Sequence, residues 1–223
     1  MTSTNNLKTS SEKAYQALLR EILGGSLPKG EFLSQRMLAE LADTSIISVR
    51  EALKRLEYEY LLESVPKWGV RIPVETRARI KDLYGIREAL EVMVAYLLCK
   101  KNDQEVGQEL IRLADEVDSI DTGVFGNLEV LAKKHRELHL LMAQNTGNQQ
   151  LVTELKRLSL WSLLYQDPKR IWEVKQENWD HWHKNLVEEI FSNDPNRAQA
   201  AMHKHIQHGL EGDLIKFDKG FFD

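Results

Sequence analysis

The chain has 223 residues, of which 42% are hydrophobic, so it is long and apolar enough for one or two domains with real cores. It contains no run of about eighteen apolar residues, and its polar N-terminus lacks an apolar signal segment, so we expect no membrane segment and a cytoplasmic protein. Its single cysteine, Cys99, excludes an intramolecular disulfide and a cysteine-based zinc cluster, and a net charge of -4 means that any DNA contact must come from local placement of basic residues.

The N-terminal part predicts three helices in close succession. Apolar residues at helical spacing indicate a helix over 12–23, which a pair of glycines ends. Ser34 is a typical N-cap for a short second helix, and Ser45 begins a third after the brief turn at 42–44. Two helices joined by so tight a turn form a helix-turn-helix.

The third helix predicts one buried face and one exposed face. Val49 and Leu53 share the apolar stripe, which leaves Ile46, Arg50 and Lys54 outside at successive i,i+4 positions. Residues 61–65 and 70–72, separated by a turn that contains Gly69, then indicate two strands. Such a hairpin is the wing of a winged helix-turn-helix.

The start of this third helix is the predicted contact with double-stranded DNA, because a recognition helix enters the major groove with its N-terminal residues against base edges. Arg50 is the expected base reader, since its planar fork can engage guanine O6 and N7 bidentately. Ile46 can pack against a thymine methyl group. An ordinary solvated basic face is the alternative interpretation of Arg36 and Lys54. The full set of predicted DNA contacts is Arg36, Ser45, Ile46, Ile47, Ser48, Arg50, Lys54, Lys67 and Trp68.

From residue 76 onward the pattern is helical without a strand signal. Six helices are expected, over residues 76–101, 104–119, 124–145, 148–166, 169–192 and 195–217. The predicted fold class is therefore mainly α, with a winged helix-turn-helix domain at 10–74 and an antiparallel all-helical bundle at 78–217.

All seven histidines lie in this second part. His135 and His139 are i,i+4 on one helix and share its apolar face, and His183 and His205 are inward on two later helices. Four imidazoles from three helices can converge on one divalent ion, and an all-nitrogen set favours zinc or nickel. Hydrogen-bonded core histidines are the alternative. The histidines expected at the surface are His181, His203 and His208. The tryptophans Trp161, Trp172, Trp179 and Trp182 are interpreted as core or as partial lining of a cavity.

The N-terminal motif also resembles a known family. The run Val49-Arg50-Glu51-Ala52-Leu53-Lys54-Arg55-Leu56 matches the V-R-E-A-L-x-R-L signature of the GntR superfamily. That resemblance implies DNA-reading roles for Arg36 and Arg50. The sequence departs from the family pattern at Ile46, where arginine is usual, at Ile47-Ser48, where Thr-Pro is usual, and at Tyr58-Glu59-Tyr60.

The second region is similar to the FadR-type (FCD) ligand-binding domain, which commonly holds a metal through one aspartate and three histidines. His139 stands nine residues before Asn148 in a Thr-Gly-Asn turn, as in that family, and His135 takes the place where aspartate is common. The resemblance implies that Arg87 faces an effector cavity, where a cation beside a metal would suit a carboxylate-bearing metabolite. An Arg87–Glu91 surface pair is the alternative.

These observations predict a ligand-responsive repressor that acts as a homodimer on a pseudo-palindromic operator and has no catalytic residues. Two alternatives remain. A metal-dependent hydrolase is disfavoured because Glu137 stands two residues after His135, whereas the zincin motif needs it directly after the first histidine. A purely structural metal, with DNA binding independent of any ligand, is the other.

Overall fold

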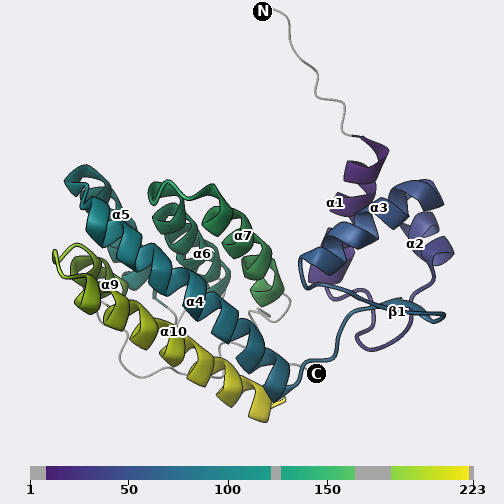
Figure 1. The fold of residues 1–223 in the computed structure, drawn as a ribbon. Coiled ribbons are helices and arrows are strands. Elements are labelled where there is room, and N and C mark those ends of the chain that lie inside the picture. The colour runs from purple at the N-terminus through teal and green to yellow at the C-terminus, as the bar shows by residue number, and fades with distance from the viewer. Residues whose placement is uncertain (1–8, 122–126, 164–181, 221–223) are drawn as a thin grey trace, which may run out of the picture. The chain divides into compact units, whose positions relative to one another are not determined.

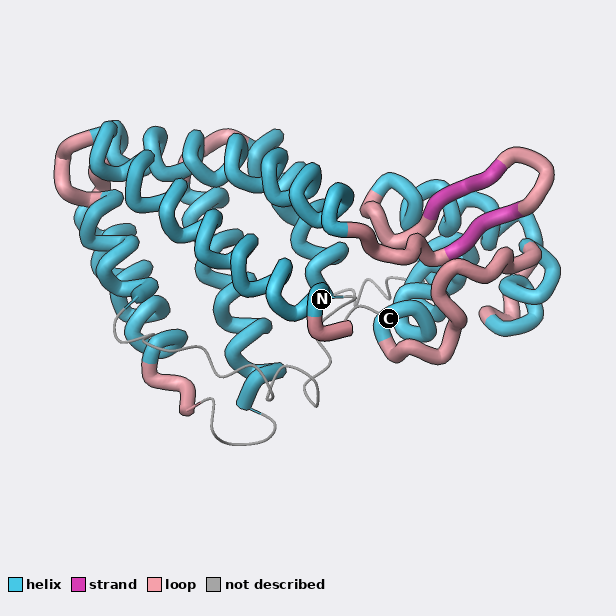
Figure 2. The backbone as a smooth tube through the Cα atoms, turned by 90° about the horizontal axis from the view of Figure 1, so that it is seen from below, coloured by secondary structure: helices cyan, strands magenta, loops and turns pink. Residues whose placement is uncertain are grey.

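The computed structural model describes residues 9–121, 127–163 and 182–220 (Figures 1 and 2). The chain divides into two compact units, and the main division falls between Val74 and Glu75. The fold is mainly helical, as predicted, with a small two-stranded sheet near the N-terminal end. Among the described residues, no helix is both long and apolar enough to cross a membrane.

The first unit is a winged helix-turn-helix. Its elements are α1 (Ser10–Leu23), α2 (Gln35–Leu41), α3 (Ile46–Tyr58), β1 (Glu63–Val65) and β2 (Gly69–Arg71). The two predicted N-caps are confirmed, because Ser34 Oγ accepts from the Met37 N–H and Ser45 Oγ accepts from the Ser48 N–H. Each cap satisfies a backbone donor that the helix itself leaves unpaired, which stabilises the helix by about 1 kcal/mol.

The wing is an antiparallel hairpin (Figure 2), shorter than the sequence predicts, and in it Ser64 pairs with Val70. A third segment joins it, because the Leu33 N–H donates to the Val70 carbonyl at 2.7 Å. Gly69 has φ 109°, and a Cβ at this position would lie 3.0 Å from the Leu33 carbonyl oxygen. The wing therefore requires glycine here, for its backbone angle and for the close approach of the neighbouring chain.

One hydrophobic cluster holds these elements together. Its fully buried members come from all parts of the unit and include Leu18 of α1, Leu38 of α2, Leu56 of α3 and Ile72 after β2. At the edge of this core Tyr15 Oη donates to the buried Glu59 carboxylate at 2.7 Å. The recognition helix α3 is thus fixed to α1 by packing and by a buried hydrogen bond.

The second unit is a helical bundle. Its described helices are α4 (Arg77–Lys101), α5 (Gln104–Asp118), α6 (Asn127–Asn145), α7 (Gln149–Leu163), α9 (Trp182–Ile190) and α10 (Pro195–Asp218). The long helices α4 and α10 lie side by side, and α9 packs against α5 and α10 (Figure 1). Cys99 is buried in α4. Of the helix predicted at 169–192, residues 182–190 are helical, and Trp172, Trp179 and His181 lie outside the described residues.

Candidate DNA interface and metal centre

The N-terminal end of α3 presents the exposed face that the sequence predicts. Ile46, Arg50 and Lys54 are exposed, whereas Val49 and Leu53 are buried. Ile47 is the most exposed of the large apolar side chains in the described part of the chain, at 72%. The exposed surface at this end of α3 therefore combines one arginine with two isoleucines.

Arg50 is oriented by a residue that sequence reasoning missed. Its Nε donates to Oε1 of Gln35, the first residue of α2, at 3.3 Å. The only signal for Gln35 in the sequence was its position directly after the predicted cap Ser34, at the start of α2. The neighbouring Arg36 is highly exposed and pairs with Glu40 one turn along α2 at 3.3 Å. Arg36 and Arg50 thus approach solvent from the two helices of the motif.

Ser48 does not belong to this exposed face, which corrects the prediction. Its side chain is only 7% exposed, and its Oγ lies 3.0 Å from Ser45 Oγ. The reason is its helical phase, because Ser48 lies four residues before the buried Ala52 and therefore shares its face of α3. Ser45 itself is exposed at the helix start.

The wing tip is exposed and aromatic. Trp68 is 69% exposed, and its ring stacks on Phe32 with centroids 5.5 Å apart. Lys67 beside it is exposed and has φ 70°, which turns the chain at the tip of the hairpin. Both predicted wing residues are therefore exposed to solvent, and Phe32 packs against the Trp68 ring.

The four predicted metal ligands converge in the second unit. His135 and His139 come from α6, His183 from α9 and His205 from α10. One ring nitrogen each of His135, His183 and His205 lies within 4.8 Å of the others. His139 Nε2 is 3.1 Å from Nε2 of both His135 and His205, and the latter two nitrogens are 3.5 Å apart.

These spacings fit a metal site. Zinc–nitrogen bonds of about 2.0 to 2.1 Å in tetrahedral geometry place ligand nitrogens about 3.3 Å apart, which the 3.1 and 3.5 Å among His135, His139 and His205 bracket. Three or four imidazoles that face one another through nitrogen also provide the soft-to-borderline donor set that zinc and nickel prefer. The histidine cluster can therefore hold a divalent ion.

Two carboxylates behind the cluster fix how its histidines present their nitrogens. Glu91 of α4 is hydrogen-bonded to His139 Nδ1, and Asp118 accepts from His183 Nδ1 at 2.6 Å. A carboxylate at Nδ1 keeps the proton there and leaves the Nε2 lone pair for a metal, which is the usual outer arrangement of metal-binding histidines. His205 Nδ1, by contrast, has no hydrogen-bond partner among the described residues.

Sequence reasoning missed the hydrogen bonds of both carboxylates to the histidines, and only Asp118 left a signal in the sequence. Asp118 is the last residue of α5, where its negative charge lies unfavourably at the negative end of the helix dipole. In the structure it accepts backbone N–H groups of His183 and Lys184 at 3.0 to 3.1 Å, so it also anchors the start of α9. Glu91 stands one turn after Arg87 and is only 1% exposed.

Burial and mutual repulsion favour the neutral forms of His135 and His205. Burial lowers the pKa of His135 and His205 well below the usual histidine value, and the neighbouring imidazoles lower it further. Burial alone would raise the pKa of Glu91, but His139 and the Arg87 guanidinium reverse this and lower it to about 2. Neutral imidazoles beside an ionised carboxylate are the protonation states that metal binding needs.

Arg87 lies next to this arrangement. Its Nε donates to Glu91 Oε1 at 2.7 Å, and Glu91 turns its other oxygen to His139. The Arg87–Glu91 pair foreseen as an alternative therefore exists, but its carboxylate is buried and belongs to the histidine cluster. The Arg87 guanidinium also lies over the Tyr84 ring, whose hydroxyl donates to Asp213 at 2.7 Å.

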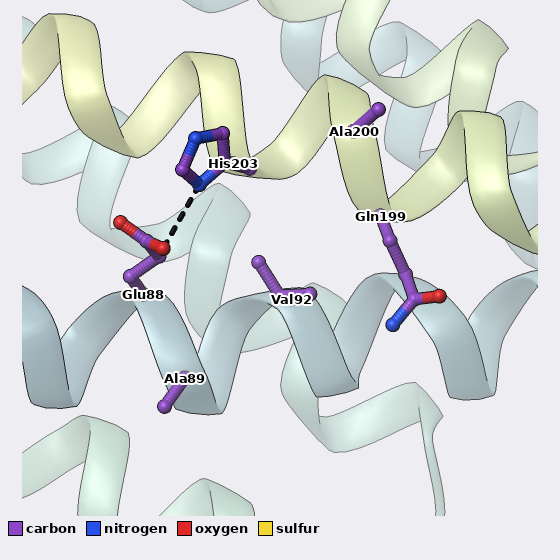
Figure 3. Close-up of a pocket in the computed structure, with 6 residues that line it drawn as sticks. All are labelled: Glu88, Ala89, Val92, Gln199, Ala200 and His203. Carbon is purple, nitrogen blue, oxygen red and sulfur yellow. Dashed lines mark hydrogen bonds and ion pairs between the residues drawn. The ribbon is translucent and has the colours of Figure 1, made fainter.

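His203, His208, Trp161 and Trp182 are the other predicted histidines and tryptophans of this region that the structure describes. His203 is exposed, as predicted, and bonds Glu88 at a groove between α4 and α10 whose lining includes none of the four predicted ligands (Figure 3). His208 is only half-buried. Trp182 stacks on His205 at 5.9 Å between ring centroids, and Trp161 is buried.

Comparison with known proteins assigns both units. Residues 10–72 match the bacterial regulatory proteins of the gntR family, and residues 82–208 match the FCD domain. The chain is a GntR-family transcriptional regulator with an FCD domain. The resemblance seen in the sequence is thereby confirmed, and the departures at Ile46, Ile47 and Ser48 do not alter the fold.

Several relatives match this GntR regulator over most of its length. YdhC of Bacillus subtilis (strain 168), an uncharacterized HTH-type transcriptional regulator, is 23% identical over 204 residues, which are 88% of each chain. The HTH-type transcriptional repressor GlaR of Escherichia coli (strain K12) is 21% identical over 202 residues, 86% of this chain and 90% of GlaR. The structure of E. coli McbR/YncC has a TM-score of 0.67 at 18% identity and covers 96% of this chain and 99% of that one.

The GntR assignment decides between the function classes. The families and relatives are transcriptional regulators, so this regulator binds DNA through its helix-turn-helix and is not an enzyme. The geometry agrees, because Glu137 is exposed while His135 and His139 on either side point into the cluster. The FCD domain of this GntR regulator carries a His135, His183 and His205 group that can bind a metal.

Proposed function

We propose that this GntR regulator is a cytoplasmic repressor whose operator binding is controlled by a small carboxylate-bearing metabolite. The metabolite binds beside a divalent ion, zinc or nickel, in the FCD domain. The printed name of the relative GlaR, a transcriptional repressor, supports the direction of control. The metal and the metabolite rest on the site itself.

The observation that carries the proposal is the convergence of four imidazoles with two supporting carboxylates. His139 joins His135, His183 and His205 as a ligand, because its Nε2 lies 3.1 Å from two of their nitrogens. A site built only to fill a core would need no carboxylate behind each of two histidines. Burying Glu91 at 1% exposure is costly unless its charge is used, and here it orients His139 and pairs with Arg87.

Arg87 is the proposed contact for the effector carboxylate. A divalent ion with a coordination number above four, such as nickel, keeps positions open for a carboxylate oxygen when the four histidines hold it. The Arg87 guanidinium, whose side chain is 22% exposed, can then bind the same or a second carboxylate through charge-assisted hydrogen bonds. Glu91 couples the two, since one of its oxygens bonds Arg87 and the other bonds His139.

DNA contact is assigned to the exposed residues of the first unit. Arg50 reads a guanine edge from α3, while Arg36, Lys54, Lys67 and Ser45 contact phosphates or groove walls. Trp68 reaches the duplex from the wing. A single winged module reads too few bases for a specific site, so we propose that two copies of the chain bind a pseudo-palindromic operator.

A structural metal is the second candidate, and a specific observation favours it. Four protein nitrogens close a tetrahedral site, whereas a site that takes an exogenous ligand keeps a position open. Under this alternative the ion stabilises the FCD domain and DNA binding responds to no ligand. A six-coordinate ion such as nickel would retain open positions with the same four histidines.

The test measures metal content and operator affinity on the same preparations. In the proposal His183→Ala loses bound zinc or nickel by elemental analysis, whereas the control His203→Ala, which alters an exposed histidine outside the cluster, retains it. Arg50→Ala keeps the metal and loses specific operator binding. Equal metal content in wild type and His183→Ala contradicts the metal site, and unchanged operator affinity of Arg50→Ala contradicts the DNA contact.

A further inference from the structure

Two exposed isoleucines occupy the first turn of the recognition helix. Ile46 is 44% exposed and Ile47 is 72% exposed. Neither belongs to the hydrophobic cluster of the first unit, nor to the partly buried apolar residues that pack against it. Their side chains therefore do not contribute to the core of the domain. They expose apolar surface to water, which is unfavourable and which the fold does not require.

The two isoleucines flank Arg50 on the helix surface. Ile47 precedes Arg50 by three residues and Ile46 precedes it by four, so both side chains are its neighbours on α3. Gln35 bonds Arg50 Nε and holds the arginine from the opposite helix. A base edge that meets the Arg50 fork therefore has its neighbouring base pairs against Ile46 and Ile47.

The major groove offers one apolar group, the C5-methyl of thymine. Isoleucine cannot donate a hydrogen bond to a base edge, but it gains free energy by covering a methyl group that water otherwise surrounds. We propose that Ile46 and Ile47 are specificity-determining residues that bind thymine methyl groups beside the guanine read by Arg50. This inference deepens the proposed function and rests on the proposed contact between Arg50 and the operator.

The expected operator half-site thus contains a guanine with thymine in the adjacent base pairs. The size of the effect follows from the burial of one methyl group, which changes affinity by about fourfold. Uracil pairs as thymine does and lacks only this methyl, so replacing thymine by deoxyuridine removes the proposed contact and leaves every hydrogen bond of the base pair.

The experiment starts from duplexes selected from a random pool by the full-length protein, and compares each with its deoxyuridine counterpart by anisotropy. We expect wild type to bind the uracil duplex about fourfold more weakly for each contacted methyl. Ile47→Ala should bind equally tightly to duplexes that carry thymine or uracil at the position contacted by Ile47. Ile47→Val should keep the preference for thymine. Tyr58→Ala, an exposed apolar residue at the far end of α3, is the matched control and should behave as wild type.

The Arg50→Ala variant distinguishes failure of the thymine-methyl contact from failure of the proposed contact between Arg50 and the operator. If wild type binds thymine and uracil duplexes equally while Arg50→Ala still loses specific binding, the isoleucines do not read methyl groups and only the inference is overturned. If Arg50→Ala binds the selected duplexes as tightly as wild type, the proposed base contact itself is wrong. Because Ile47 is exposed, its variants should keep the wild-type unfolding temperature, and a circular dichroism melt checks this.

Discussion

The carboxylate of Glu91 should control how tightly the histidine cluster binds metal. It bonds Arg87 through one oxygen and His139 Nδ1 through the other. Glu91→Gln keeps the shape of the side chain but turns one of these oxygens into an NH2 donor. The substitution therefore tests the charge and the hydrogen-bond direction without leaving a cavity.

Each orientation of the new amide damages the site. If the NH2 faces His139, the imidazole must accept at Nδ1 and carry its proton on Nε2, which then has no lone pair for a metal. If the NH2 faces Arg87, two donors meet at the position of a 2.7 Å hydrogen bond, and the partly buried guanidinium loses its counter-charge. The first orientation lowers metal affinity directly, and the second also lowers the stability of α4.

The expected loss is between tenfold and a hundredfold in zinc affinity, the range for residues that support metal ligands. The free energy of unfolding without metal should fall by about 1 to 3 kcal/mol, because a buried charged hydrogen bond loses its partner. Competition with a chromophoric chelator measures the affinity, and urea unfolding in a chelating buffer measures the stability. The matched control is Glu88→Gln on the same helix, whose carboxylate bonds the exposed His203 instead.

Glu88→Gln should bind zinc as wild type does. If Glu91→Gln also binds zinc with wild-type affinity, the carboxylate does not set the state of His139 and the account of the cluster is refuted. If the two variants lose affinity equally, the loss reflects general charge on α4 and not the contact with the ligand.

Three further predictions concern the two units separately. Arg50→Ala should lose about 1 to 3 kcal/mol of discrimination between the selected operator and random DNA, with a smaller change in non-specific binding, and anisotropy titrations at two salt concentrations check both. In metal-free protein the free energy of unfolding should fall as the pH drops below about 6.5, because the depressed pKa values of His135 and His205 mean that the unfolded chain takes up protons which the folded chain cannot. Urea unfolding at pH 7.5 and 5.5 tests this, and equal stability at the two values would contradict it. Leu56→Ala should lower the free energy of unfolding of the first unit by about 2 to 5 kcal/mol, since its side chain is fully buried there. A calorimetric scan in which that unit keeps its unfolding temperature would contradict this prediction.

The sequence predicts the fold well because its local signals agree with one another. Ser34 and Ser45 are caps in the structure as in the prediction, since a serine oxygen directly before an amphipathic stretch accepts a backbone N–H that the helix leaves unpaired. The inward positions of His139, His183 and His205 also follow from helical periodicity, because their apolar neighbours on the same face must be buried.

What the sequence did not predict depends on contacts between elements distant along the chain. Glu91 and Asp118 support histidines 48 and 65 residues away, and no local pattern encodes such a pairing. Gln35 reaches Arg50 only because the turn folds α2 back on α3. The residue type of Ser48 predicts a DNA contact at the surface, while its position on the same helix face as Ala52 buries it. In each case the three-dimensional packing, and not the residue type, decides the role.

We propose that a ligand at the histidine cluster controls DNA binding. The most direct measurement is the operator affinity of the metal-loaded protein with and without each member of a panel of small mono- and dicarboxylates, repeated with His183→Ala. We predict that at least one carboxylate changes the wild-type dissociation constant by fivefold or more, the usual lower range of allosteric coupling, and that none changes that of His183→Ala. A wild-type affinity that no carboxylate alters, or a response that survives in His183→Ala, would contradict control through the histidine cluster.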